Sequence, residues 1–127
     1  MVPMIWKLCG IRNYKKEIDI LYKKELNGIG DIKFQENHPQ SVPNSWLFTF
    51  RTKRMRDLLD YLNKNKIQSR PFWTPMNNLP MYKSLKYVNE KDISNKIFKE
   101  CISIPSSSNL TIQDQLKVIT EIKNFYN

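Results

Sequence analysis

Apolar side chains recur every three or four residues near the start of the chain, and this spacing predicts an amphipathic helix over residues 11–26. The residues that form the apolar stripe are Ile11, Tyr14, Ile18 and Leu21, with Tyr22 beside them. On the polar side, Asp19 and Lys23 lie one helical turn apart in the favourable order for an ion pair. Gly28 suits the left-handed position that follows a helix, so the helix should end just before it.

Three further helices are predicted, over residues 54–65, over residues 92–100 and from just after Thr111 to near the last residue. The first of these carries an apolar stripe of Met55, Leu58, Leu59 and Leu62. The last one has a capping signature, because Thr111 precedes it and Asp114 follows three residues later. Its predicted apolar face consists of Ile112, Leu116, Ile119, Ile122 and Tyr126.

Short segments between the helices are predicted as strands, over residues 32–34, 45–52, 67–70 and 101–104. Prolines follow the last two of them, and two X-Pro pairs make residues 36–44 a loop. The predicted fold class is therefore α+β, with a small, mainly antiparallel sheet of three to four strands packed against about four helices.

The chain has 127 residues, a length typical of one domain, so residues 1–127 are interpreted as a single domain. No run of about 18 apolar residues occurs, and the first ten residues lack the basic start of a signal peptide. We therefore expect a cytoplasmic protein. Cys9 and Cys101 lie outside any C-x-x-C pattern and away from the histidine, so both are predicted to be ordinary thiols.

A formal net charge of +9 suggests an anionic partner, which could be nucleic acid, a phosphorylated metabolite or a membrane surface. Basic residues concentrate in positions 51–70, namely Arg51, Lys53, Arg54, Arg56, Lys64, Lys66 and Arg70. With Trp46, Phe48 and Phe50 nearby, this segment permits a nucleic-acid-binding module, although a solvated basic helix face explains the same pattern.

The sequence contains no recognisable catalytic or metal-binding signature. Glycines occur only at positions 10, 28 and 30, which excludes a glycine-rich phosphate loop. His38 is the single histidine and precedes a proline in a polar loop, so neither a His-containing catalytic pair nor a His-based metal site is predicted.

Residues 70–82 combine a cation, aromatic rings, two adjacent amides and three prolines. Arg70 can bind phosphate with two parallel hydrogen bonds, and Asn77 can hydrogen-bond hydroxyl groups. Trp73 or Tyr82 can pack on the face of a sugar or a base. The segment therefore suits a polar, phosphorylated or sugar-bearing ligand, while the alternative is a proline-rich connection that places its aromatic rings in the core.

Segments spread over the chain from about Ile11 onward resemble, in the right order, the C-terminal domain of the DegT-type sugar aminotransferases. The resemblance is carried by Asn44-Ser45-Trp46-Leu47-Phe48-Thr49, the helix of residues 55–66, Ile67 to Arg70, the loop of residues 75–82, Ile102-Ser103-Ile104-Pro105, and Leu110-Thr111 with Asp114-Gln115 and Val118-Ile119. The family's Pro-x-His-x-x-Pro-x-Tyr loop has Asn77 here in place of the histidine.

These enzymes are fold type I pyridoxal-phosphate enzymes that act on nucleotide-linked keto sugars, and the Arg-Pro-Phe-Trp variant is similar to branches that aminate C4 of dideoxy sugars for bacterial surface glycans. The resemblance implies that Arg70, Trp73, Asn77 and Tyr82 line part of the substrate pocket. It places the cofactor lysine and its acidic partner in an earlier domain. The chain alone is then expected to bind no pyridoxal phosphate, to bind nucleotide sugar weakly, and to be inactive.

Such a domain should also expose surface that meets a separate cofactor domain or a second copy of the chain. Ile5, Trp6 and Leu8 precede the first apolar stripe and lack a local core. We expect these side chains to pack against another chain or to stay mobile.

Overall fold

The computed structural model describes the backbone of residues 4–127 and the side chains of residues 10–127. Along the chain, the elements are α1 (Met4–Leu26), β1 (Phe48–Arg51), α2 (Met55–Lys64), β2 (Arg70–Pro71), the 3-10 turns η1 (Met76–Asn78) and η2 (Pro80–Tyr82), α3 (Ile93–Glu100), β3 (Cys101–Ile104) and α4 (Ile112–Tyr126). Four helices and a three-stranded sheet confirm the predicted α+β class. None of the helices in this described part is long and apolar enough to cross a membrane.

The sheet is antiparallel throughout and has the strand order β1-β3-β2. Phe48 pairs with Ile104 and Arg51 pairs with Cys101, so β1 matches the whole length of β3. On the other side of β3, Arg70 pairs with Ser103. β3, the last strand in the sequence, is therefore the central strand of the sheet, and it pairs with β1 and β2, which come much earlier in the sequence.

Two predicted strands are much shorter than expected. In residues 32–34, only Lys33 pairs, through a single antiparallel bridge to Arg51. The strand predicted over residues 67–70 begins at Arg70 and includes Pro71. The preceding residues are held against α2 instead, because the N–H of Ile67 donates to the Leu62 carbonyl at 2.9 Å and that of Ser69 to Asn63 Oδ1 at 3.1 Å.

The strand predicted over residues 45–52 begins only at Phe48. Ser45 has a positive φ of 51°, and the N–H of Trp46 donates to Asn44 Oδ1 at 3.1 Å. This local turn uses the backbone groups that a strand would need, so Trp46 lies in the loop before β1.

The first helix begins well before the predicted start at residue 11 and ends, as predicted, at Leu26. Gly28 has a φ of 78°, which is the left-handed conformation expected after a helix. The side chains of Ile5, Trp6 and Leu8 lie outside the described residues, so the expectation about their packing stays a prediction.

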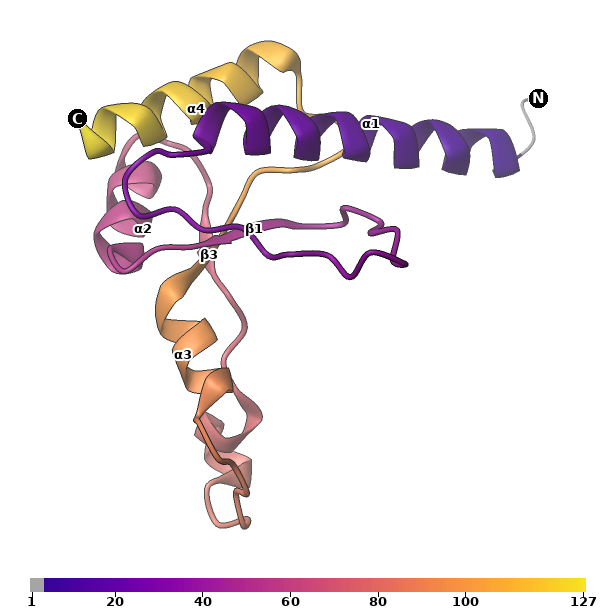
Figure 1. The fold of residues 1–127 in the computed structure, drawn as a ribbon. Coiled ribbons are helices and arrows are strands. Elements are labelled where there is room, and N and C mark those ends of the chain that lie inside the picture. The colour runs from indigo at the N-terminus through magenta and orange to yellow at the C-terminus, as the bar shows by residue number, and fades with distance from the viewer. Residues whose placement is uncertain (1–3) are drawn as a thin grey trace.

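The core lies between α1, α2 and α4 on one side and the sheet on the other (Figure 1). Its fully buried members include Tyr22, Phe50, Leu62, Ile102 and Ile122. The predicted apolar face of α4 is partly wrong, because Ile112 and Leu116 are exposed while Gln115 and Val118 are buried. Gln115 is tolerated there because its Nε2 donates to the Ile18 carbonyl at 2.8 Å, which leaves its amide group satisfied.

A hydrogen-bonded cluster holds the end of α4 against the start of α2. Asp31 accepts hydrogen bonds from the Thr52 hydroxyl at 2.5 Å, the Lys53 N–H at 2.7 Å and the Tyr126 hydroxyl at 3.2 Å. Burial alone would raise the pKa of Asp31, but these hydrogen bonds outweigh it and the pKa lies below its usual value. Gly30 is needed beside this cluster, because a Cβ there would lie 2.2 Å from the Tyr126 ring at a φ of 53°.

Residues 72–92, here called the arm, connect β2 to α3 and extend away from the body of the molecule (Figure 1). The arm contains both 3-10 turns, and every residue from Pro80 to its end is exposed. Exposed apolar side chains on it include Met76, Met81 and Leu85. The arm therefore adds little to the core, and its apolar surface is open to other groups.

The two ends of α4 should differ sharply in their contribution to stability. Ile122→Ala removes a fully buried side chain and should lower the free energy of unfolding by roughly 3 kcal/mol. Ile112→Ala is the matched control, because this isoleucine is 64% exposed; its effect should stay below about 0.5 kcal/mol. Urea denaturation measures both, and equal losses would contradict the observed burial.

Candidate functional site

A groove of about 860 Å³ runs along β1 and the loop that precedes it. The residues of its wall that matter here are Asn44, Trp46, Thr49, Arg51, Phe72 and Ile97. Thr49 and Arg51 point to the side of β1 opposite to the buried Phe48 and Phe50, since side chains alternate along a strand. The groove therefore includes the polar side of β1, although Phe48 and Phe50 also belong to its lining, and it has an aromatic border.

The aromatic border continues beyond the groove and is here called the aromatic edge, formed by Trp46, Phe72 and Trp73. The ring centroids of Trp46 and Trp73 lie 6.1 Å apart, and those of Phe72 and Trp73 lie 5.0 Å apart. Both tryptophans are 62% exposed. Indole rings usually bury most of their large apolar surface, so two adjacent exposed ones form a surface suited to the flat face of a ring.

Hydrogen bonds from α1 and β3 hold the aromatic edge in place. The Lys15 ammonium donates to the Trp46 carbonyl at 2.8 Å and also to the Ser106 carbonyl. The Ser106 hydroxyl accepts from the Phe48 N–H at 3.2 Å, which fixes the start of β1. On the other side, the Phe72 N–H donates to the Cys101 carbonyl at 3.0 Å. Both loops that bring the rings together are therefore tied to the folded core.

Burial lowers the pKa of Lys15, because the partly enclosed ammonium loses water that would stabilise its charge. Its two carbonyl acceptors are backbone oxygens of the loop before β1 and of the segment after β3. Lys15 is therefore a positioning residue for Trp46.

The four site residues predicted from the sequence lie along β2 and the arm. Arg70 and Trp73 are exposed, Tyr82 is 36% exposed and Asn77 is half-buried. The Asn77 amide donates to Asn78 Oδ1 at 3.2 Å. None of the four belongs to the lining of the groove, so a single concavity shared by all of them stays a prediction.

Sheet register nevertheless relates Arg70 to the groove. Thr49 and Arg70 both pair with Ser103, one from each neighbouring strand, so the three residues form one row across the sheet. Side chains in such a row lie on the same face. The Thr49 and Ser103 hydroxyls are 2.8 Å apart and hydrogen-bonded. Arg70 therefore lies on the sheet face that borders the groove.

Trp46 and Lys15 were not identified as site residues from the sequence. The sequence did contain a signal for the position of Trp46. The side chain of Asn44 can accept a hydrogen bond from the Trp46 N–H, and the resulting turn makes β1 begin after Trp46. No local signal existed for Lys15, whose partners are 31 and 91 residues away.

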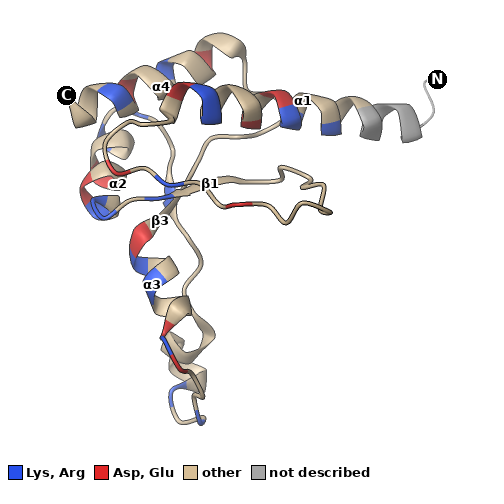
Figure 2. Cartoon of the chain, viewed as in Figure 1, with Lys and Arg blue, Asp and Glu red and all other residues tan. Residues whose placement is uncertain are grey.

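Three arginines of the basic segment 51–70 make contacts within the chain, whereas its other basic residues, Lys53, Lys64, Lys66 and Arg70, are exposed. Arg51 pairs with Glu100 at 2.5 Å, and the Arg54 guanidinium lies 4.2 Å from the centroid of the Phe125 ring. The Arg56 guanidinium lies 5.9 Å from the Phe98 ring. Figure 2 shows acidic and basic positions interspersed along α1 and α4. Within the residues that the structure describes, no group of three or more His, Cys, Asp or Glu side chains is placed to hold a metal ion.

Removing the Lys15 ammonium should loosen the aromatic edge. In Lys15→Met, amide hydrogen exchange of residues 44–47 should accelerate about tenfold, as expected when roughly one hydrogen bond is lost. Lys24→Met, an exposed lysine of the same helix, is the control and should leave these rates unchanged. Equal exchange rates in the wild type and Lys15→Met would contradict the positioning role.

Comparison of the sequence with known proteins identifies a family. The model of the DegT/DnrJ/EryC1/StrS aminotransferase family matches residues 5–123. The chain is 32% identical over 119 residues to GDP-perosamine synthase of Vibrio cholerae, covering 89% of this chain and 32% of that protein. It is 25% identical over 115 residues to GDP-perosamine synthase of Escherichia coli O157:H7, covering 88% of this chain and 30% of that protein.

The fold agrees with solved sugar aminotransferases. The structure of S. venezuelae DesV in complex with a ketimine intermediate superposes with a TM-score of 0.84 at 20% identity, covering 91% of this chain and 32% of that one. Sugar aminotransferase CalS13 from Micromonospora echinospora superposes with a TM-score of 0.79 at 18% identity, covering 89% and 30%. The chain thus spans about a third of the length of the relatives it matches. It belongs to the DegT/DnrJ/EryC1/StrS aminotransferase family.

Proposed function

We propose that this chain is the substrate-binding part of a sugar aminotransferase that acts on nucleotide-linked keto-deoxy sugars for bacterial surface glycans. It contributes side chains to the sugar pocket, while pyridoxal phosphate is held by a separate cofactor domain. The observation that carries the proposal is the exposed aromatic edge beside a groove, found in a chain of this family.

The groove, the aromatic edge beside it and the adjoining sheet face support a ligand with both a ring and polar groups. Trp46 and Trp73 offer aromatic faces that can stack on a sugar or a base. Thr49 and Asn44 offer groups that hydrogen-bond hydroxyls, and Arg70 lies on the same sheet face. The guanidinium of Arg70 suits a phosphate, which it can bind with two parallel hydrogen bonds.

Two residues of the arm complete the proposed contact set. Asn77 and Tyr82 belong to the successive 3-10 turns η1 and η2, and both keep part of their surface exposed. The prolines before and within these turns restrict the backbone, so ordering this segment on a ligand costs less entropy than ordering a glycine-rich loop. We assign both residues to the sugar side of the pocket.

Two features of the described residues weigh against a pyridoxal phosphate site among them. This cofactor needs a lysine amine free to react and a set of N–H donors for its phosphate. The lysine whose pKa burial lowers is Lys15, and its ammonium is already bound by two carbonyls. Near the start of α2, the Lys53 N–H donates to the Asp31 carboxylate and is likewise occupied. No chemical step is therefore assigned to a lysine of this chain.

A nucleic-acid-binding module was the other interpretation of the +9 charge. Arg51, Arg54 and Arg56 are engaged with Glu100 and aromatic rings of the same chain. Nucleic-acid binding needs cations free to reach phosphates, and these contacts occupy three of the seven basic residues of segment 51–70, while Lys53, Lys64, Lys66 and Arg70 stay exposed. We prefer the substrate-binding interpretation because the chain belongs to an aminotransferase family.

The proposal predicts weak binding of a GDP-linked hexose that depends on the aromatic edge. Trp46→Ala and Trp73→Ala should each weaken binding about tenfold, the usual scale for losing one stacked ring. Tyr87→Ala is the control, because this exposed aromatic residue of the arm is not part of the groove. Isothermal titration calorimetry measures the affinities. Unchanged affinity in both tryptophan variants, or no binding by the wild type, would refute the proposal.

A further inference from the structure

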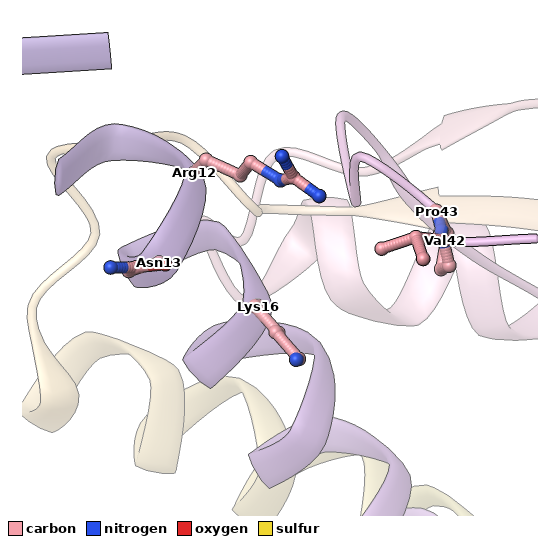
Figure 3. Close-up of a pocket in the computed structure, with 5 residues that line it drawn as sticks. All are labelled: Arg12, Asn13, Lys16, Val42 and Pro43. Atoms are coloured by element: carbon pink, nitrogen blue, oxygen red, sulfur yellow. The ribbon is translucent and has the colours of Figure 1, made fainter. Parts of the chain in front are cut away.

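A second, smaller hollow lies between α1 and the loop before β1, and is here called the α1 hollow. It encloses about 250 Å³ and is lined by Arg12, Asn13, Lys16, Val42 and Pro43. Figure 3 shows Arg12 and Lys16 extending from α1 on the side of Val42 and Pro43, whereas the Asn13 amide points away. Two cations from one helix thus face an apolar wall formed by the loop.

The charge of this hollow is not compensated by the protein. Arg12 and Lys16 are one helical turn apart, so their like charges repel each other. No acidic side chain lines the hollow, and neither cation takes part in an ion pair among residues 10–127. An anion between them would relieve the repulsion and supply hydrogen-bond acceptors.

The opposite wall is held in position before any ligand arrives. Pro43 restricts its own backbone, and the Ser41 N–H donates to the His38 carbonyl at 2.8 Å, which closes a turn just before it. After Pro43, the Lys15 hydrogen bond to Trp46 ties the loop to α1. A site with such fixed walls loses less entropy when a ligand binds.

The α1 hollow adjoins the groove, since Pro43 lines both of them. One ligand with an anionic group and a ring can therefore occupy the two together. A guanidinium binds phosphate oxygens in pairs, and an ammonium adds a point charge, so Arg12 and Lys16 match the two negative charges of a diphosphate linkage.

We propose that the α1 hollow is a phosphate-binding site in which Arg12 and Lys16 hold the diphosphate of the nucleotide sugar. The identity of the whole ligand in this inference rests on the proposed function. The phosphate-binding site itself rests only on the α1 hollow. Trp46, which lines the groove, belongs to the same loop as Pro43, which lines both the groove and the α1 hollow.

Inorganic pyrophosphate is the first probe, because it tests the phosphate site without a sugar or a base. By isothermal titration calorimetry, the wild type should bind it saturably. The double variant Arg12→Gln with Lys16→Gln should bind it about tenfold more weakly, as expected when a charge-assisted hydrogen bond is lost. Lys83→Gln with Lys86→Gln removes the same charge from exposed positions of the arm and should bind like the wild type.

Equal losses in the two double variants would show a response to net charge alone and would overturn the inference, as would absence of saturable binding. The affinity for the GDP-linked hexose should also fall about tenfold in the Arg12→Gln, Lys16→Gln variant. If the affinity for pyrophosphate depends on these cations but the affinity for the GDP-linked hexose does not, the diphosphate assignment is wrong. If binding of the GDP-linked hexose depends on these cations but not on Trp46 or Trp73, the proposed function is refuted, whereas the phosphate-binding site is supported.

Discussion

The hydrogen bonds of the Lys15 ammonium connect the parts of the molecule that face a ligand. One bond reaches the Trp46 carbonyl before β1, and the other reaches the Ser106 carbonyl after β3. Because both acceptors are backbone oxygens, the constraint fixes the path of the chain rather than a single rotamer. The groove, the aromatic edge and the wall of the α1 hollow all include the loop that this lysine holds.

The rest of the fold provides a rigid base for this constraint. The buried faces of α1, α2 and α4 close the core on one side of the sheet, and the Asp31 cluster ties α2 to the end of α4. The opposite side of β1 carries the polar side chains of Thr49 and Arg51, which line the groove. This division explains how a small domain can present an aromatic surface without losing its stability: the exposed rings belong to loops, while the core is complete without them.

Local patterns predicted the elements whose residues interact mainly with near neighbours. The stripe of α2 and the cap of α4 are as expected, with the Asp114 N–H donating to Thr111 Oγ1 at 3.1 Å. Predictions failed where a distant or local hydrogen bond replaced the expected one, as for residues 67–69 against α2. On α4, the spacing of apolar residues predicted that Leu116 is buried. Instead, Gln115 is buried and donates a hydrogen bond to the Ile18 carbonyl of α1, while Leu116 is exposed.

The site was predicted in the same uneven way. Arg70 and Trp73 were predicted from residue type and family resemblance, and their place in a substrate pocket stays a prediction, although the sheet register places Arg70 on the face that borders the groove. Trp46 was predicted to lie in a strand because tryptophan has a high β propensity. In the structure, the turn closed by the hydrogen bond from the Trp46 N–H to Asn44 Oδ1 keeps it in the loop before β1. Lys15 depends on contacts 31 and 91 residues along the chain, which no local pattern contains.

The central claim is that this chain recognises the substrate and leaves the cofactor to other residues. Borohydride trapping tests it: the chain is incubated with pyridoxal phosphate, reduced, and digested, and mass spectrometry locates the modified lysines. We expect sparse labelling spread over exposed lysines, equal in the folded chain and in the urea-unfolded control. Stoichiometric labelling of one lysine in the folded chain alone, abolished by replacing that lysine with arginine, would contradict the account.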